Sequence, residues 1–429
     1  MEQLLHYAWK HRMLPVPLRT TDGRDVELLD PGLHNHEAGP DFFNAKVKIG
    51  GTLWVGNVEI HHRSSDWFAH GHNRDRAYDN VVLHAVEEAN SDVTDTTGRI
   101  IPQVVFHVPK KIADNYAELL AEERYPPCYR LIPSVPKVMT HSWMAALQAE
   151  RLERKTEDIK GRAERHAGSW EKAFFITLAR NYGFGVNSDA FEQWASIVSL
   201  DAIGHHRDDL FVIEAIFLGQ AGLLNIETMP EKHRQEVLAD DYFNRLCREY
   251  DYQKHKFGLE TMDHKRWRFL RLRPQNFPNI KISQLANMYY EKKVSLRSVV
   301  ECPTIEGLRT LLTTHVTPYW ERHYTFASES VENKKCLSKE SIDLLLINTV
   351  IPLIFAYGKN FMSANLCDRA IDMLDSLKAE KNHIVTMWRE VGLDVITAGD
   401  SQALLQLKNE YCDRKDCLRC RFGYEYLRL

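Results

Sequence analysis

Residues 34–67 read HNHEAGPDFFNAKVKIGGTLWVGNVEIHHRSSDW, and this segment carries the most structural information in the chain. Two runs rich in Val, Ile, Phe and Trp, 42–49 and 52–62, flank Gly50-Gly51, a pattern typical of a tight hairpin. Side chains alternate along a strand, so Glu59 and His61 lie on one face of the return strand. The outgoing strand begins at Asp41, at the same end of the hairpin.

The register of this hairpin decides whether Asp41 reaches Glu59. We expect Ile49 to pair with Thr52 across the turn. In regular register Asp41 then lies opposite Ile60, one residue away from Glu59. A bulge or a splayed strand entry restores the convergence, and bulges are common beside active sites. We therefore expect an irregularity in the outgoing strand.

Two carboxylates brought together at one end of adjacent strands repel each other unless a cation lies between them. Magnesium or manganese suits Asp41 and Glu59, because these ions take oxygen ligands and leave room for a phosphate. The surrounding segment is also rich in imidazole, since ten of the 20 histidines lie within residues 6–107. The pattern predicts a metal site in the first quarter of the chain.

The segment resembles the PD-(D/E)xK nuclease-like superfamily, in which an Asp begins the second core strand and (D/E)xK lies on the third. Asp41 matches the family's Asp, Glu59 its acidic metal ligand and His61 the position of its lysine, and Glu37 matches an additional acid of some members. The resemblance implies a restriction-endonuclease-like sheet and a metal-dependent nuclease acting on nucleic acid. With lysine replaced, His61 serves as a base or a metal ligand, or the site is inactive and the protein only binds nucleic acid or acts as a scaffold.

The chain also resembles, over essentially its full length, an uncharacterised bacterial family of unknown function. The motifs that carry this resemblance are GPDF-NA, GNVEIHHRSSDW and HGH, in this order and ahead of a helical remainder. The family brings no activity with it, so the resemblance implies a fold grouping and leaves the substrate open.

The polar run after the return strand contains Arg63, His70 and His72. We expect Arg63 to bind a phosphate oxygen, and His70 and His72 to contact phosphate or metal. The alternative is that these residues only form solvated turns and helix caps. A further alternative function is a zinc hydrolase built on histidines of this region, namely His34, His36, His61 and His70.

Beyond residue 110 the apolar spacing becomes helical, so the sequence predicts an α+β protein. We expect a nuclease-like domain at 1–125 with a mixed sheet, a proline-rich linker at 126–136, and a larger, mostly α-helical region at 137–429, divided into one or two subdomains. The apolar stretch 344–358 is short for a membrane span and predicts a buried helix. The N-terminus lacks the pattern of a signal peptide, so we expect a cytoplasmic protein without membrane contact.

A basic segment at 265–273 belongs to the helical region. It interleaves Trp267 and Phe269 with four arginines, Arg266, Arg268, Arg271 and Arg273. Cations that bind phosphates and aromatic rings that stack on bases are typical of nucleic-acid surfaces. The alternative is an amphipathic segment with a solvated charged face. The formal net charge of −4 excludes a uniformly basic, DNA-coating protein.

Three cysteines near the C-terminus, Cys412, Cys417 and Cys420, lie within one polar turn. Three thiols at this spacing are typical of part of a zinc or iron-sulphur site, which needs a fourth ligand from elsewhere. Cys336 and Cys367 are candidates for that ligand. The placement resembles PD-(D/E)xK nucleases that hold an iron-sulphur cluster with three C-terminal cysteines. The alternative is three reduced thiols without metal.

Overall fold

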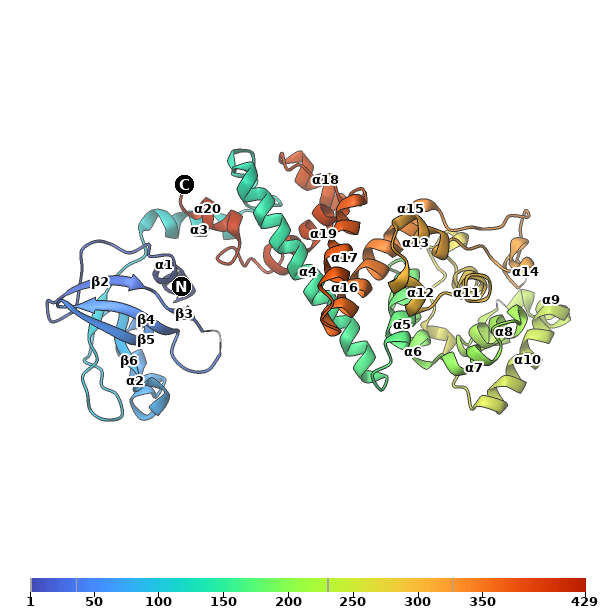
Figure 1. The fold of residues 1–429 in the computed structure, drawn as a ribbon, viewed down its shortest axis with the longest axis horizontal. Helices are drawn as coiled ribbons and strands as arrows, with labels where there is room; N and C mark the ends of the chain where they lie inside the picture. The colour runs from blue at the N-terminus through green and yellow to red at the C-terminus, as the bar shows by residue number, and fades with distance from the viewer. Residues whose placement is uncertain (1, 36, 230, 327) are drawn as a thin grey trace. The chain divides into compact units, whose positions relative to one another are not determined.

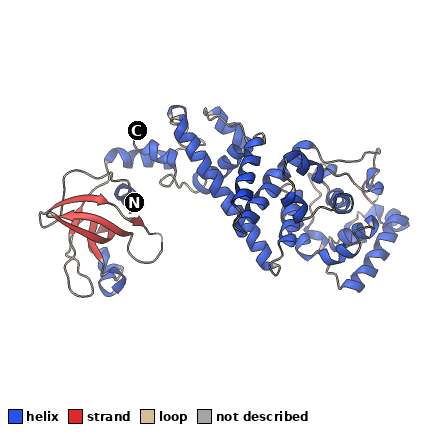
Figure 2. Ribbon diagram, in the orientation of Figure 1, coloured by secondary structure: helices blue, strands red, loops and turns tan. Residues whose placement is uncertain are grey.

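The computed structural model describes residues 2–35, 37–229, 231–326 and 328–429, and it divides into two compact units. One unit comprises residues 1–137, 390–393 and 407–429 and contains the large sheet. The other comprises residues 138–389 and 394–406 and is almost entirely helical. Figure 2 shows this separation of strands from helices. The chain is therefore α+β, as expected from the change of pattern near residue 110.

The sheet unit begins with a helix and continues as a seven-stranded mixed sheet in the described residues (Figure 1). Its elements are α1 (Glu2–Lys10), β1 (Leu18–Arg19), β2 (Asp25–Asp30), β3 (Leu33–His34), β4 (Phe42–Ile49), β5 (Thr52–Arg63), α2 (Asp66–Ala69), β6 (Val81–Glu88), β7 (Gln103–Val105), α3 (Lys110–Ala121) and α20 (Arg421–Leu427). Short 3-10 turns follow α2 at His72–Arg74 and Arg76–Tyr78.

The strand order is β1-β2-β4-β5-β6-β7, and β3 pairs with the first residues of β4, Phe42 and Phe43. Strands β4 and β5 are antiparallel, whereas β5 pairs parallel with β6 and β6 parallel with β7. A bridge between Thr20 and Val104 joins the two ends of the sheet, so that it closes nearly into a barrel. The core between the sheet and α1 is apolar and includes Trp9, Phe42 and Ile60.

The hairpin follows the expectation from the two glycines. Ile49 pairs with Thr52, and both Gly50 (φ 55°) and Gly51 (φ 88°) have left-handed backbones. A two-residue turn with both φ values positive matches the right-handed twist of the flanking strands, and glycine adopts it without a Cβ clash. The turn is thus the feature of the sequence that fixes where β5 begins.

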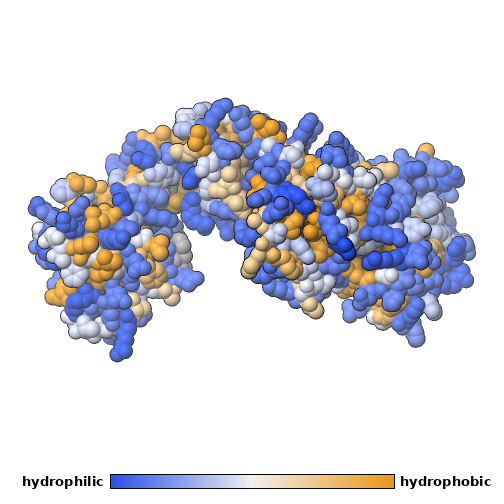
Figure 3. Space-filling view, in the orientation of Figure 1, coloured by the Kyte–Doolittle hydropathy of each residue, from blue (hydrophilic) through white to orange (hydrophobic). Residues whose placement is uncertain are grey.

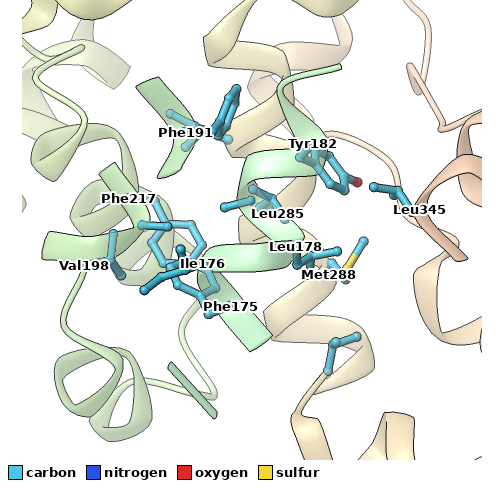
Figure 4. Close-up of a cluster of buried hydrophobic side chains, with 14 of the residues drawn as sticks. Phe175, Ile176, Leu178, Tyr182, Phe191, Val198, Phe217, Leu285, Met288 and Leu345 are labelled. Atoms are coloured by element: carbon cyan, nitrogen blue, oxygen red, sulfur yellow. The ribbon is translucent and has the colours of Figure 1, made fainter. Parts of the chain in front are cut away.

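The helical unit consists mainly of α-helices, and its described residues also include one small hairpin and a long connection at 258–277 with two 3-10 turns. Its elements are α4 (Lys137–Arg165), α5 (Trp170–Tyr182), α6 (Ser188–Ile197), α7 (Leu200–His205), α8 (Leu210–Gln220), α9 (Arg234–Ala239), α10 (Asp241–Phe257), α11 (Pro278–Asn287), α12 (Leu296–Glu301), α13 (Ile305–Leu312), α14 (Pro318–Glu321), β8 (His323–Thr325), β9 (Ser328–Glu329), α15 (Lys339–Leu345), α16 (Ile351–Asn360), α17 (Ala364–Ser376), α18 (His383–Glu390) and α19 (Ala398–Gln406). Figure 4 shows part of its core, where Phe175, Phe217 and Leu285 from three helices meet.

One segment of this unit, Lys339–Asn360, has the length and composition of a membrane-spanning helix. In the structure 72% of its most apolar window is buried inside the protein. A π-turn at Leu346–Val350 separates α15 from α16 within it. The burial agrees with a core helix. On the face shown in Figure 3, hydrophobic residues form only scattered patches among hydrophilic ones.

The domain boundary differs from the expectation at the C-terminal end. The sequence pattern predicts one helical region from residue 137 to 429, whereas Leu407–Leu429 groups with the sheet unit. The reason is packing, because α20 lies against α3, and Asn115 Nδ2 of α3 donates to the carbonyl oxygens of Tyr426 and Leu427 at 3.2 Å each. The predicted linker at 126–136 ends next to Lys137, the last residue of the first segment of the sheet unit.

Candidate metal centre

A bulge in β4 sets the register that brings the two acidic residues together. From Ile49 and Thr52 the ladder runs regularly along most of the hairpin, and it then shifts by one residue, so that Phe42 pairs with Val58. Asn44 lies inside this irregularity and adopts a left-handed backbone, with φ 55°. Asparagine tolerates this conformation better than most residues. The expected irregularity in the outgoing strand is therefore confirmed.

The bulge places Asp41 beside Glu59 at the end of the hairpin. The Asp41 backbone N–H donates to Glu59 Oε2 at 3.1 Å, and the Ile60 N–H donates to Asp41 Oδ2 at 2.9 Å. Each carboxylate thus accepts a hydrogen bond from the opposite strand. The two side chains are held by backbone groups on both sides, which gives the pair a fixed geometry.

Burial makes this carboxylate pair hard to ionise. The pKa of Asp41 is raised above its ordinary value, first by desolvation and second by the nearby Glu59 carboxylate. Desolvation likewise raises the pKa of Glu59. Glu2, at the start of α1, raises both pKa values further. A pair of this kind releases its protons readily only when a positive charge is bound next to it.

His61 lies at the centre of a group of histidines. Its Nδ1 is 2.9 Å from His84 Nε2, and its Nε2 is 3.1 Å from His70 Nδ1. The same Nε2 lies 3.4 Å from Glu59 Oε1. His61 is 2% exposed and His84 is fully buried, whereas His70 is exposed. His61 therefore joins the acidic pair to an imidazole that solvent reaches.

His72 adds a fourth imidazole to those of His61, His70 and His84. One ligand nitrogen each from His61, His70 and His72 lie within 4.8 Å of one another. His72 Nε2 is also 3.1 Å from Glu59 Oε1, yet this buried nitrogen has no hydrogen-bond partner among the described residues. The ring is held from the other side by stacking on Tyr78 with a centroid distance of 3.8 Å. A buried ring nitrogen aimed at a carboxylate without a hydrogen bond is what a metal ligand presents.

Burial favours the neutral form of the buried imidazoles in this group. Desolvation and the neighbouring histidines lower the pKa of His61 to about 2, and desolvation lowers the pKa of His84 to about 3. The pKa of His72 is also lowered, mainly by desolvation. Metal binding requires an unprotonated imidazole, so His61 and His84 need no proton loss before an ion binds at neutral pH, and the shift of the His72 pKa is in the same direction.

Helix α1 contributes a residue that approaches the site from the other side. His6 Nε2 lies 3.4 Å from Asp41 Oδ2. The ring of His34 meets that of His6 edge-on at 5.5 Å and stacks on Phe42 at 4.7 Å. His34 therefore supports His6 through ring contacts. His36, proposed as a zinc ligand, lies outside the described residues.

The donor set fits a divalent cation held by oxygen and nitrogen. Asp41 and Glu59 supply carboxylate oxygens, which suit Mg²⁺ and Mn²⁺. His61, His70 and His72 supply imidazole nitrogens, which suit Zn²⁺ and also Mn²⁺. The His72 Nε2 atom, which lacks a hydrogen bond, and the raised pKa values of both acids are consistent with an ion at this position.

Two residues expected at the site do not join it. Glu37 is exposed on the loop before β4, where its backbone N–H donates to Asn35 Oδ1 at 2.9 Å. Arg63 lies at the far end of β5, is exposed, and forms an ion pair with Glu88 at 3.2 Å. The physical reason is strand direction, because two further residues of β5 carry Arg63 beyond His61.

The basic segment lies in the helical unit. Trp267 is buried and its Nε1 donates to the Ala221 carbonyl at 2.7 Å, while Phe269 packs against Phe277. The four arginines, Arg266, Arg268, Arg271 and Arg273, are exposed. The aromatic rings therefore anchor the segment in the core, as in the amphipathic alternative, and the arginines form a charged surface.

A family model described as "Protein of unknown function (DUF2851)" matches residues 2–383. The chain belongs to the DUF2851 family. The match includes every residue of the candidate metal centre and ends before the three C-terminal cysteines. Comparisons with curated proteins and with solved structures found no significant match. The resemblance to an uncharacterised family is thereby confirmed, and the function must be argued from the site itself.

Two histidines of the centre have no clear signal in the sequence. His6 is far from Asp41 in the chain, and only the packing of α1 on the sheet joins them. The apolar strand around His84 predicts a core histidine, and it is fully buried, but its ring is hydrogen-bonded to His61. The high density of histidine in the first quarter of the chain predicts a site in this region, but it does not predict which histidines form the site.

Proposed function

We propose that the protein is a metal-dependent phosphodiesterase that acts on nucleic acid through Asp41, Glu59 and His61. The observation that carries the proposal is the bulge, which places the half-buried Asp41 and the buried Glu59 next to each other, beside a histidine whose pKa is lowered by burial. An antiparallel hairpin followed by a strand parallel to β5 supports a restriction-endonuclease-like core. A bound ion in such a centre supplies Lewis-acid polarisation of the phosphate and a more acidic water.

His61 is better suited to bind a metal, or to position His70 and His84 by hydrogen bonds, than to act as a base. A group with a pKa near 2 has almost no tendency to accept a proton at neutral pH. His70 is the exposed member of the histidine group and is hydrogen-bonded to His61. We assign to His70 the transfer of a proton between the attacking water and solvent. His6, beside Asp41, completes the polar wall on the side of α1.

Cleavage assays on full-length protein test this function. The metal-free protein is supplied with Mg²⁺, Mn²⁺ or Zn²⁺ and given single- and double-stranded DNA and RNA. We expect cleavage with Mg²⁺ or Mn²⁺, and a loss of at least about 100-fold in Asp41→Asn and Glu59→Gln, which keep the hydrogen bonds but remove a charge. The control is Glu27→Gln, an exposed acid on β2 of the same sheet.

Two results contradict the proposal. Asp41→Asn or Glu59→Gln that cleaves at the wild-type rate shows that the site is elsewhere. Wild-type protein that binds metal but cleaves none of the substrates favours the alternative of a catalytically silent protein that binds nucleic acid or acts as a scaffold.

A second candidate function, a zinc hydrolase, is favoured by the three imidazoles within 4.8 Å. Three histidine ligands are a common catalytic zinc set. His61 and His70 are expected in such a site, and His72 takes part in place of His34. Zinc that remains through dialysis, together with activity lost in His72→Ala and not supported by Mg²⁺, selects this function over the first.

A further inference from the structure

A second cluster of metal-type ligands lies in the sheet unit, outside the centre described above. Cys128, Cys412, Cys417 and Cys420 line one small cavity of about 20 Å³. The other lining residues include Leu119, Pro127 and Tyr411, so the cavity wall is otherwise largely apolar. No disulfide joins any of the eight cysteines, all of which lie in described parts of the chain. Four cysteines therefore line the same cavity, three from the C-terminal turn and one from the segment after α3.

The surrounding backbone is built closely around these thiols. A side chain at Gly423, at the start of α20, would meet the Cys417 carbonyl oxygen at 2.0 Å, so only glycine fits there. Lys415 Nζ donates to the carbonyl of Leu120 at the end of α3, at 2.8 Å. The turn that carries the three cysteines is thus held against α3 and the segment that carries Cys128.

The thiols influence one another electrostatically. Desolvation raises the pKa of Cys128 well above its ordinary value, and the next contributions come from Cys420, Cys412 and Cys417. The pKa of Cys412 is also raised, first by desolvation and then by Cys420. Four thiolates in an apolar pocket repel one another strongly, and a thiophilic cation relieves that repulsion.

We propose that Cys128, Cys412, Cys417 and Cys420 form a four-thiolate metal centre that fastens the C-terminal segment to the sheet unit. Four cysteine sulfurs are a complete ligand set for structural zinc and for an iron–sulfur cluster. Cys336 and Cys367, the candidates for the fourth ligand from the sequence, do not take that place. Cys336 is exposed and Cys367 donates to the Phe355 carbonyl at 3.7 Å, both within the helical unit. The assignment does not depend on the proposed nuclease function.

The test is metal analysis of full-length protein purified both aerobically and anaerobically. If the four cysteines bind zinc, we expect about one zinc ion per chain and a colourless protein. A four-iron cluster predicts about four iron atoms and four acid-labile sulfides, with visible absorbance that is lost in air. We expect Cys128→Ser and Cys417→Ser to lose this metal and to melt at a lower temperature. The matched control Cys367→Ser keeps it.

A measurement without substitutions covers the case in which the variants fail to fold. In native wild-type protein we expect Cys128, Cys412, Cys417 and Cys420 to resist alkylation, and to react together once a chelator or acid removes the metal, as identified by peptide mass. Absence of zinc and iron from both preparations overturns the proposal. Retention of the metal by Cys128→Ser, with loss in Cys417→Ser, overturns the assignment of the fourth ligand.

Discussion

Asp41 and Glu59 place two acids in a space that disfavours their charge. Their raised pKa values mean that the folded protein keeps protons that the unfolded chain releases above about pH 4. Stability of the metal-free protein therefore falls as pH rises from about 4 toward the raised values, because charging the pair then opposes folding. A bound cation reverses this effect, since it favours the ionised pair.

We expect Asp41→Asn to stabilise the metal-free protein at pH 8 and to change little at pH 5, where the native pair is protonated. The gain should be about 1 kcal/mol, or roughly 2–4 °C in the melting temperature of a unit of this size. Thermal melts in the presence of a chelator measure it, with Glu27→Gln as the control. A variant that is less stable at pH 8 would show that the wild-type pair is not strained by charge.

His61→Lys distinguishes a metal ligand from the counterpart of the nuclease lysine. His61 is buried, neutral and bonded to two other histidines, so we expect an ammonium there to repel the ion and to abolish metal binding. Titration calorimetry with Mn²⁺ measures the effect. Binding and cleavage at or above the wild-type level would instead show that this position works as the family's lysine does.

Strand β4 carries the irregularity on which the centre depends. Asn44 adopts its left-handed backbone in the bulge, and its N–H donates to Asn57 Oδ1 at 3.3 Å. We expect Asn44→Val to cost about 1–2 kcal/mol, because a β-branched residue clashes in this conformation, and to weaken metal binding by disturbing Asp41. Asn44→Gly serves as the control and should keep both properties. Calorimetry and thermal melts decide, and unchanged affinity in Asn44→Val would separate the bulge from the site.

The hairpin shows how far this sequence carries a prediction. Gly50-Gly51 predicts the pairing of Ile49 with Thr52, and counting from that pair reveals that an irregularity is needed for Asp41 to meet Glu59. The position of the bulge at Asn44 is not apparent, because the left-handed preference of asparagine is weak and several polar residues follow Pro40. Local rules thus predict the need for the bulge but not its place.

Contacts between distant segments are beyond such rules. Cys128 looks like one of the scattered cysteines, because nothing near it in the chain indicates a ligand site. Its proximity to Cys412 arises only from the packing of α20 on α3. The contact of His6 with Asp41 is unpredictable for the same reason, because the position of a histidine in a helix does not indicate which distant residue it contacts. Such contacts form when a helix packs on another element. The apolar spacing within one helix predicts that it has a buried face, but it does not predict which element covers that face.

The exposed arginines of the helical unit extend the proposal to the whole molecule. We expect replacement of Arg266, Arg268, Arg271 and Arg273 by alanine to weaken nucleic-acid binding at low salt. The slope of log affinity against log salt concentration should become shallower by about 0.9 for each phosphate that the variant no longer neutralises. Binding curves at several salt concentrations measure both effects. The control replaces Lys46 and Lys48, which are exposed on β4. An unchanged slope in the arginine variant would show that these arginines form a solvated surface that does not bind phosphates.

The sheet unit is assembled from segments that are far apart in the sequence, with the helical unit inserted between them. Helix α20 contacts α3 and also approaches α1, where the ring centroid of Tyr424 lies 6.5 Å from that of Tyr7. During synthesis, residues 1–137 leave the ribosome about 15 to 60 s before α20 does, at about 5 to 20 residues per second. The first segment of the sheet unit is therefore synthesised well before the helix that packs on α3. Until α20 has been synthesised, the surface of α3 on which it packs and the neighbouring segment with Cys128 lack their covering.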